Sequence, residues 1–327
     1  MTEDSKVQIN EVVLRDGLQN EPEFVATADK IALADLLSAT GIRRLETTSF
    51  VSPKAIPNLR DASEVFAGIT RSEDIHYTAL VPNKRGADRA LASHVDEVNL
   101  VMSIGEKHNL ANMQMTCDQS LAQFRDILDM IAGSGIYPNG TIATAFGCPF
   151  EGPQTPARVL WAIETYRAMG IKGITVADTI GVANPRQVGQ LVALILQDHP
   201  DLHLTLHFHN TRDLGLANAL AAYDAGARSF DSALGGIGGC PYAPGATGNI
   251  CTEDLVHMFH QCGIQTGVDL DRLIDVSHKL TSVLGHQTPG FVAKAGPSNK
   301  HHGRLSQCVN SISSIGRYEQ PYPASIA

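Results

Sequence analysis

Two histidines separated by a single residue form the clearest metal-binding pattern in the chain. His207 and His209 lie in an apolar run that predicts a β-strand, where side chains two residues apart point to the same face. Both imidazoles can therefore reach one ion, for which Asp16 and Asn249 are candidate oxygen ligands. A nitrogen and oxygen donor set without thiolate favours Mg²⁺ or Mn²⁺ over structural zinc. The alternative is a pair of packed, hydrogen-bonded strand histidines.

A glycine-rich segment with two prolines, residues 235–249, carries the thiol of Cys240. Glycine lets the backbone close over a ligand and proline restricts it, so the segment is typical of a shaped loop that exposes a thiol to substrate. A cysteine with the ordinary pKa of about 8.5 is mostly protonated near neutral pH and can donate a proton. A thiolate nucleophile activated by a histidine is the alternative role. Cys148, in a second Gly-Cys-Pro run, is expected to be packed.

Arg15 and Asp16 are adjacent directly after the first apolar run. Arg15 is a candidate for stabilising an oxyanion, because guanidinium is a rigid donor that stays charged. Glu46 is a candidate for orienting Arg15 or a ligand. The alternatives are a local ion pair between Arg15 and Asp16, and a buried, paired strand carboxylate for Glu46.

Short β-rich runs alternate with amphipathic helical stretches along most of the chain. The predicted strands are Gln8–Leu14, Arg44–Thr48, His76–Leu80, Glu97–Met102, Thr141–Phe146, Gly173–Ala177, Leu204–Phe208 and Ser229–Leu234. The predicted helices include Ala28–Thr40, Ser120–Ser134, Pro156–Ala168, Pro185–Gln197 and Gly215–Ala225. This alternation predicts an α/β fold, a (β/α)8 TIM barrel, with a doubly wound sheet as the alternative. We expect residues 1–285 to form the barrel and residues 286–327 a C-terminal extension that acts as a lid, subunit contact or tail.

The predicted barrel brings the candidate residues to one place. Active sites of such barrels lie at the carboxyl ends of the strands, where connecting loops from all strands meet. The polar residues at or just after predicted strand ends are Arg15, Asp16, Glu46, Asp178, His207, His209, Cys240 and Asn249. Although far apart in sequence, they are predicted to converge at one mouth.

Several motifs in order make the chain similar to the hydroxymethylglutaryl-CoA lyase family, within the metal-dependent TIM-barrel lyases and Claisen-type synthases. They are Leu14–Glu21, Thr48–Lys54, Phe146–Gly152, Asp178–Gly181, His207–His209, Cys240–Asn249 and Thr252–Leu255. The metal ligands that the resemblance implies, for Mg²⁺ or Mn²⁺, are Asp16, His207, His209 and Asn249. It implies that Arg15 polarises the thioester carbonyl and that Cys240 donates a proton. The residues that it assigns to lining or orienting the substrate pocket are Glu46, Asp178, Gln19, Ser49 and Thr175.

The resemblance implies retro-Claisen cleavage of an acyl-CoA thioester, 3-hydroxy-3-methylglutaryl-CoA, to acetyl-CoA and acetoacetate. The base is left open between Asp16, His207 and a metal-bound water. The chain departs from the family pattern at Arg212, which brings a positive charge near the mouth, so a related 3-hydroxyacyl-CoA such as citramalyl-CoA is an alternative substrate. A Claisen-type synthase would carry Glu-Arg in place of Cys240-Pro241. A non-catalytic barrel that binds CoA esters would not need both the metal ligands and the thiol.

The composition bears on partners and location. A net charge of −9 argues against nucleic acid or an anionic membrane as a partner. No apolar run is long enough to predict a membrane span. Six scattered cysteines without a CxxC pair indicate reduced thiols, so we expect a cytoplasmic protein. A homodimer or higher homo-oligomer is the expected assembly.

Overall fold

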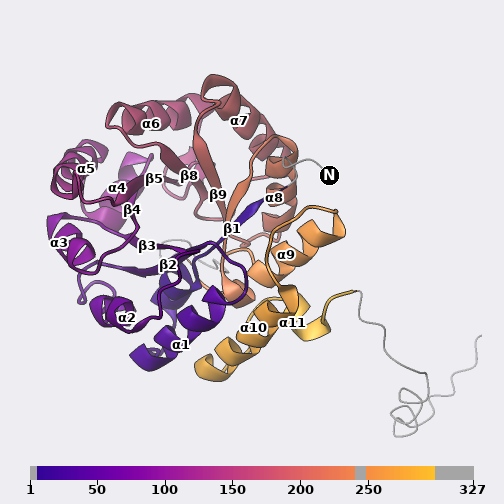
Figure 1. Cartoon of the computed structure of the whole chain (residues 1–327). Helices are drawn as coiled ribbons and strands as arrows, with labels where there is room; N and C mark the ends of the chain where they lie inside the picture. The colour runs from indigo at the N-terminus through magenta and orange to yellow at the C-terminus, as the bar shows by residue number, and fades with distance from the viewer. Residues whose placement is uncertain (1–5, 240–247, 299–327) are drawn as a thin grey trace, which may run out of the picture.

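Eight parallel strands close into a barrel that helices surround (Figure 1). The structure is a computed structural model that describes residues 6–239 and 248–298. The strands follow the order β1, β10, β9, β8, β5, β4, β3 and β2, and β2 pairs with β1 to close the ring. The barrel strands are β1 (Gln8–Glu11), β2 (Arg44–Ser49), β3 (His76–Leu80), β4 (Glu97–Ser103), β5 (Tyr137–Ala143), β8 (Gly173–Asp178), β9 (His203–Phe208) and β10 (Ser229–Ser232). The predicted TIM barrel is confirmed.

A helix follows each barrel strand and covers the outside of the barrel (Figure 1). The helices are α1 (Thr27–Ser38), α2 (Ala62–Gly68), α3 (Lys84–Ala92), α4 (Glu106–Met113), α5 (Cys117–Ile131), α6 (Pro156–Ala168), α7 (Pro185–Asp198), α8 (Gly215–Asp224), α9 (Thr252–Gln261), α10 (Leu270–Leu284) and α11 (Val292–Ala295). Thr155 and Asn184 cap α6 and α7, each accepting a hydrogen bond from a backbone N–H three residues on. Among the described residues, no helix combines the length and the apolar character that crossing a bilayer requires.

The barrel interior is polar and hydrogen-bonded. On β4, Val98 and Leu100 are fully buried in the apolar core, whereas Asn99 between them bonds to a neighbouring strand. Asn139 on β5 donates to Asn99 Oδ1 at 2.9 Å and to Thr175 Oγ1 on β8 at 3.0 Å. Pairing between buried polar groups offsets their loss of hydration. The inside of the barrel is therefore a packed network rather than a pore.

The β5 strand starts four residues and ends three residues earlier than the sequence indicates. The predicted strand is Thr141–Phe146; the residues before it include Pro138 and Gly140, which are typical of a turn. Instead, Tyr137–Ala143 pairs in parallel with all of β4. Thr144, with a φ of 57°, then turns the chain out of the sheet and into a short hairpin, β6 (Gly147–Cys148) and β7 (Gly152–Pro153). The expected burial of Cys148 is confirmed.

The first part of the predicted C-terminal extension packs against the barrel. The N–H of Gly290 donates to the carbonyl of Gly235 at 2.9 Å, and the carboxylate of Asp254 on α9 accepts from the N–H groups of Phe291 and Val292. Residues 299–327 lie outside the described residues. A domain boundary at residue 285 therefore stays a prediction.

Candidate active site and metal centre

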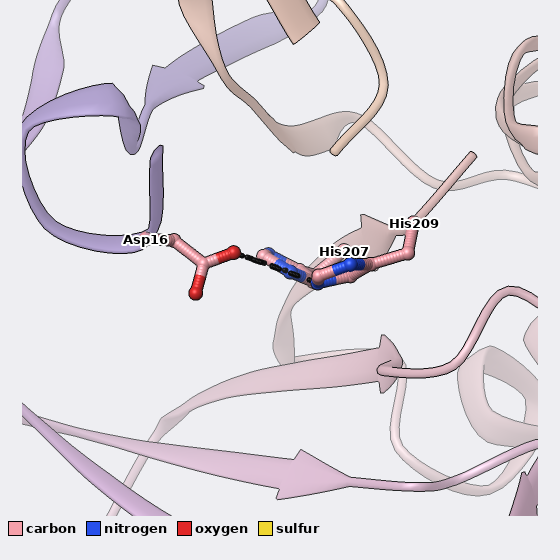
Figure 2. A group of neighbouring side chains, drawn as sticks. All are labelled: Asp16, His207 and His209. Carbon is pink, nitrogen blue, oxygen red and sulfur yellow. Dashed lines mark ion pairs between the residues drawn. The ribbon is translucent and has the colours of Figure 1, made fainter. Parts of the chain in front are cut away.

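Asp16, His207 and His209 converge at the carboxyl ends of the strands (Figure 2). Asp16 Oδ2 lies 3.8 Å from Nε2 of His207 and 3.5 Å from Nε2 of His209. One atom from each of the three residues lies within 4.8 Å of the other two, and all three residues are buried. One carboxylate oxygen and two imidazole nitrogens can therefore bind a single divalent ion.

A tight turn after β1 places Asp16 in the mouth. The sequence predicts that β1 continues to Leu14, but the strand ends at Glu11. The chain turns there because the carbonyl of Val12 accepts hydrogen bonds from the backbone N–H groups of residues 15, 16 and 17. This winds one turn of π-helix, a geometry that is frequent at functional sites. A Cβ at Gly17 would come within 2.9 Å of Val13, so the turn depends on glycine there. The turn directs Asp16 toward the histidines.

Asn249 joins the same centre through Asp16. His209 lies one residue beyond the end of β9 and pairs with Asn249 in an isolated antiparallel bridge. Asn249 Nδ2 donates to Asp16 Oδ2 at 2.7 Å and to the carbonyl of Ile237 at 3.1 Å. Its buried Oδ1 has no partner among the described residues. A buried amide oxygen without a partner, beside a carboxylate and two imidazoles, fits an oxygen ligand of a cation.

Arg15 bridges two buried carboxylates. Its Nε lies 2.6 Å from Glu46 Oε2, and its Nη1 lies 2.5 Å from Asp16 Oδ1. Burial lowers the pKa of Arg15, but Glu46 and Asp16 outweigh this and raise it, so the guanidinium stays charged. Burial likewise raises the pKa of Asp16, but Arg15 and the histidines hold it well below its usual value. The ion pair considered as an alternative to a functional role exists, and it lies within the site.

Both carboxylate oxygens of Glu46 accept hydrogen bonds. Its Oε2 faces Arg15 and its Oε1 accepts from Asn99 Nδ2 at 2.8 Å. Asn99 in turn connects to Asn139 and Thr175 through the interior network. Glu46 is thus a buried strand carboxylate paired with Arg15, and a catalytic role in orienting Arg15 stays a prediction.

The remaining pocket residues take different positions. Gln19 Nε2 donates to Asp16 Oδ1 at 2.9 Å, which places Gln19 at the centre. Thr175 lies deeper, in the interior network, and Ser49 is buried at the end of β2. Cys240 lies outside the described residues. Its role as a proton donor stays a prediction.

Asp178 holds a turn. Its two carboxylate oxygens accept hydrogen bonds of 2.9 Å from the N–H groups of Val182 and Ala183, in the connection between β8 and α7. Burial raises the pKa of Asp178, against the effect of these two hydrogen bonds. Its backbone carbonyl accepts from the N–H of His209. Asp178 thus shapes the loop beside the metal centre.

Asp231 is a site residue that sequence reasoning missed. Its Oδ2 lies 3.1 Å from Nδ1 of His207. Burial raises the pKa of Asp231, but the interaction with His207 outweighs this and lowers it. Burial lowers the pKa of His207, but Asp231 outweighs it and the pKa is raised. No local motif marks Asp231; only the pairing of β10 with β9 places it beside His207.

A cavity of about 480 Å³ lies at the opposite end of the barrel, lined by residues near the starts of β1, β9 and β10 such as Gln8, His203 and Ser229. No group of metal-ligating side chains has been found there among the described residues. The candidate metal-binding side chains lie instead at the carboxyl ends of the strands, as expected for this architecture.

Comparison with known families places this geometry in context. The family model described as HMGL-like matches residues 6–280. The chain belongs to the HMGL-like family. The resemblance inferred from the motifs is therefore confirmed.

Relatives of this HMGL-like chain include a (R)-citramalyl-CoA lyase of Chloroflexus aurantiacus, 43% identical over 89% of this chain and 95% of the relative. A hydroxymethylglutaryl-CoA lyase of Bacillus subtilis is 41% identical over 87% of this chain and 95% of its own. A solved structure of an HMG-CoA lyase from Acinetobacter baumannii, in complex with coenzyme A and 3-methylmalate, is 53% identical. It covers 93% of this chain and 99% of its own, with a TM-score of 0.90.

Proposed function

We propose that the chain is a metal-dependent carbon–carbon lyase that cleaves 3-hydroxy-3-methylglutaryl-CoA to acetyl-CoA and acetoacetate. The observation that carries this proposal is the juxtaposition of Arg15 with the centre formed by Asp16, His207 and His209. Two relatives at 41% and 53% identity carry the name HMG-CoA lyase.

Asp16, His207, His209 and the amide oxygen of Asn249 would hold the divalent ion, with Mg²⁺ or Mn²⁺ as the proposed species. When bound, such an ion acts as a Lewis acid that acidifies and orients a coordinating hydroxyl group. The unpartnered Asn249 Oδ1 supports this ligand set. The donors contain no sulfur among the described residues, which agrees with a hard cation.

The chain's own residues supply the other elements of the reaction. Removal of the proton from the tertiary hydroxyl forms the ketone of acetoacetate, breaks the adjacent C–C bond and leaves its electron pair on the acetyl-CoA enolate. Asp16, or a water molecule beside it, would take this proton, because the Nε2 of His207 is directed at the cation and its Nδ1 faces Asp231. The guanidinium of Arg15, held by Glu46, would stabilise the enolate oxygen. A proton from Cys240 would then convert the enolate carbon to the methyl group of acetyl-CoA.

A second candidate substrate is citramalyl-CoA. Arg212 Nη1 donates to the carbonyls of Ile180 and Gly181, in the loop that Asp178 shapes beside the centre. This fixes an extra positive charge near the mouth, and one relative is named (R)-citramalyl-CoA lyase. The same C–C cleavage would apply, because both thioesters carry a 3-hydroxyl group.

The experiment that tests the proposal compares the two thioesters with purified protein and Mn²⁺, identifying products by mass spectrometry. A higher kcat/KM for 3-hydroxy-3-methylglutaryl-CoA in wild type supports the main proposal, and the reverse order supports citramalyl-CoA. Arg212→Ala serves as the variant that should alter this ratio. Two intact thioesters, with metal still bound, would reject both substrates.

A homodimer or larger homo-oligomer and a cytoplasmic location are further proposals that rest on the sequence.

A further inference from the structure

Three neighbouring strands place one residue each in a single layer beside the metal centre. The register aligns Asn10 on β1 with Asp231 on β10, and Asp231 with His207 on β9. Residues aligned across strands of one sheet have side chains on the same side, so all three meet inside the barrel. The register of the barrel thus places the Asp231 carboxylate beside Nδ1 of the candidate metal ligand His207.

Both oxygens of the Asp231 carboxylate are held. Oδ2 lies 3.1 Å from His207 Nδ1, and Oδ1 accepts from Asn10 Nδ2 at 2.8 Å. Asn10 is itself fixed, because its Oδ1 accepts from Gln8 Nε2 at 2.8 Å and its Nδ2 also contacts Ser229 Oγ at 3.1 Å. The carboxylate therefore cannot turn away from His207 without breaking this layer.

The two histidines of the centre are positioned by different means. The Nδ1 of His209 has no hydrogen-bond partner among the described residues, and its place is set by the backbone, through its N–H to Asp178 and its bridge to Asn249. His207 instead has a carboxylate on Nδ1 while Nε2 faces Asp16. Both imidazoles face Asp16 through Nε2, but of the two only His207 has a side-chain partner on Nδ1 among the described residues.

We propose that Asp231 is a positioning residue that fixes the tautomer and ring orientation of His207 and thereby sets the affinity of the centre for a divalent cation. A carboxylate at Nδ1 holds the proton on that nitrogen and leaves the Nε2 lone pair directed at the site. The inference rests on the metal centre of the proposed function and not on the identity of the thioester.

Mn²⁺ binding to the full-length protein without substrate tests this directly. Free Mn²⁺ is measured by electron paramagnetic resonance in a titration of EDTA-stripped protein. We expect Asp231→Ala to weaken Mn²⁺ binding by about 10–100-fold, the usual cost of losing such a partner. Asp231→Asn keeps an acceptor without the charge and should lose less. Asp96→Ala is the matched control, because Asp96 directly precedes β4, at the amino ends of the strands, and pairs with Arg71 instead.

Four outcomes decide the inference. Wild-type affinity in folded Asp231→Ala, judged by circular dichroism and Tm, would overturn it. If Asp231→Ala does not fold, Asp231→Asn and Asn10→Ala take its place, and unchanged affinity in both would overturn it equally. In a weakened variant, excess Mn²⁺ should restore kcat, whereas a purely structural defect would lower Tm without that rescue. Failure of wild type itself to bind Mn²⁺ would reject the metal centre as well as the role of Asp231.

Discussion

The amide of Asn249 donates a 2.7 Å hydrogen bond to Oδ2 of Asp16, the same oxygen that faces both imidazoles. This contact ties the end of the glycine-rich segment to the turn after β1. Asn249 is therefore placed to couple the segment that carries Cys240 to the metal centre.

Asn249→Ala should weaken Mn²⁺ binding by about tenfold or more, because it removes both a candidate ligand and the hydrogen bond to Asp16. Titration calorimetry measures the affinity. Asn218→Ala is the control, since this buried asparagine donates to the carbonyl of Ala183 and does not touch the centre. Equal Mn²⁺ affinity in Asn249→Ala and wild type would exclude Asn249 as a ligand.

Arg15→Lys should lower kcat by about 10²–10³-fold while the Mn²⁺ affinity changes little, because one ammonium cannot reproduce the fork that contacts Glu46 and Asp16. Glu46→Gln keeps an acceptor toward Arg15 and should cost less. Steady-state kinetics separate kcat from KM, and metal titration checks the centre. A full wild-type kcat in Arg15→Lys would show that Arg15 does not stabilise the transition state.

Asp178→Ala should lower the free energy of unfolding by about 1–3 kcal/mol, because the buried N–H of Ala183 and the half-buried N–H of Val182 lose their acceptor. Urea unfolding measures this loss. Asp178→Asn keeps one acceptor oxygen and should be intermediate. If Asp178 instead acts on the substrate, Asp178→Ala would lower kcat strongly at an unchanged urea midpoint.

Glu11 should make the stability depend on pH. Burial raises the pKa of Glu11 to about 8, against hydrogen bonds from Leu234, Thr252 and Val13 that lower it. The folded state then keeps a proton that the unfolded chain releases near pH 4.5. Between these two pKa values the folded state binds more protons than the unfolded chain. The stabilisation that protonated Glu11 supplies is therefore complete below the unfolded pKa and is lost as pH rises through the folded pKa.

The variant Glu11→Gln isolates this effect. Glutamine stays neutral and its amide oxygen can keep both N–H bonds, so wild type should lose stability relative to Glu11→Gln by at most about 1.4 kcal/mol per pH unit. Urea unfolding between about pH 5 and pH 8 measures the difference. Glu64→Gln, an exposed change on α2, controls for the loss of one charge. A difference that does not vary with pH would contradict the raised pKa.

The barrel could be predicted from the sequence because each strand and helix leaves a local pattern. β3 was predicted with its observed ends, and α6 likewise. The start of β5 could not be predicted, because Pro138 and Gly140 are typical of a turn and only their pairing with β4 makes them part of a strand. The end of β1 depends similarly on a turn that winds around one carbonyl.

The cluster of Asp16, His207 and His209 could be predicted for a different reason. His207 and His209 share a strand face, and the barrel rule places Asp16 at the same end. Asp231 has no such signal, because a lone aspartate in a strand shows its partner only through the register with β9. The role of Asp178 in holding a turn likewise depends on N–H groups that the sequence does not distinguish.

Metal-dependent cleavage of a 3-hydroxyacyl-CoA is tested most directly by one measurement. Acetyl-CoA release from 3-hydroxy-3-methylglutaryl-CoA is followed with EDTA-stripped protein, and again after Mn²⁺ is returned to the same sample. We predict no release without metal, full recovery with Mn²⁺, and no recovery in His209→Ala. Release at an undiminished rate from protein shown to be metal-free would contradict the account.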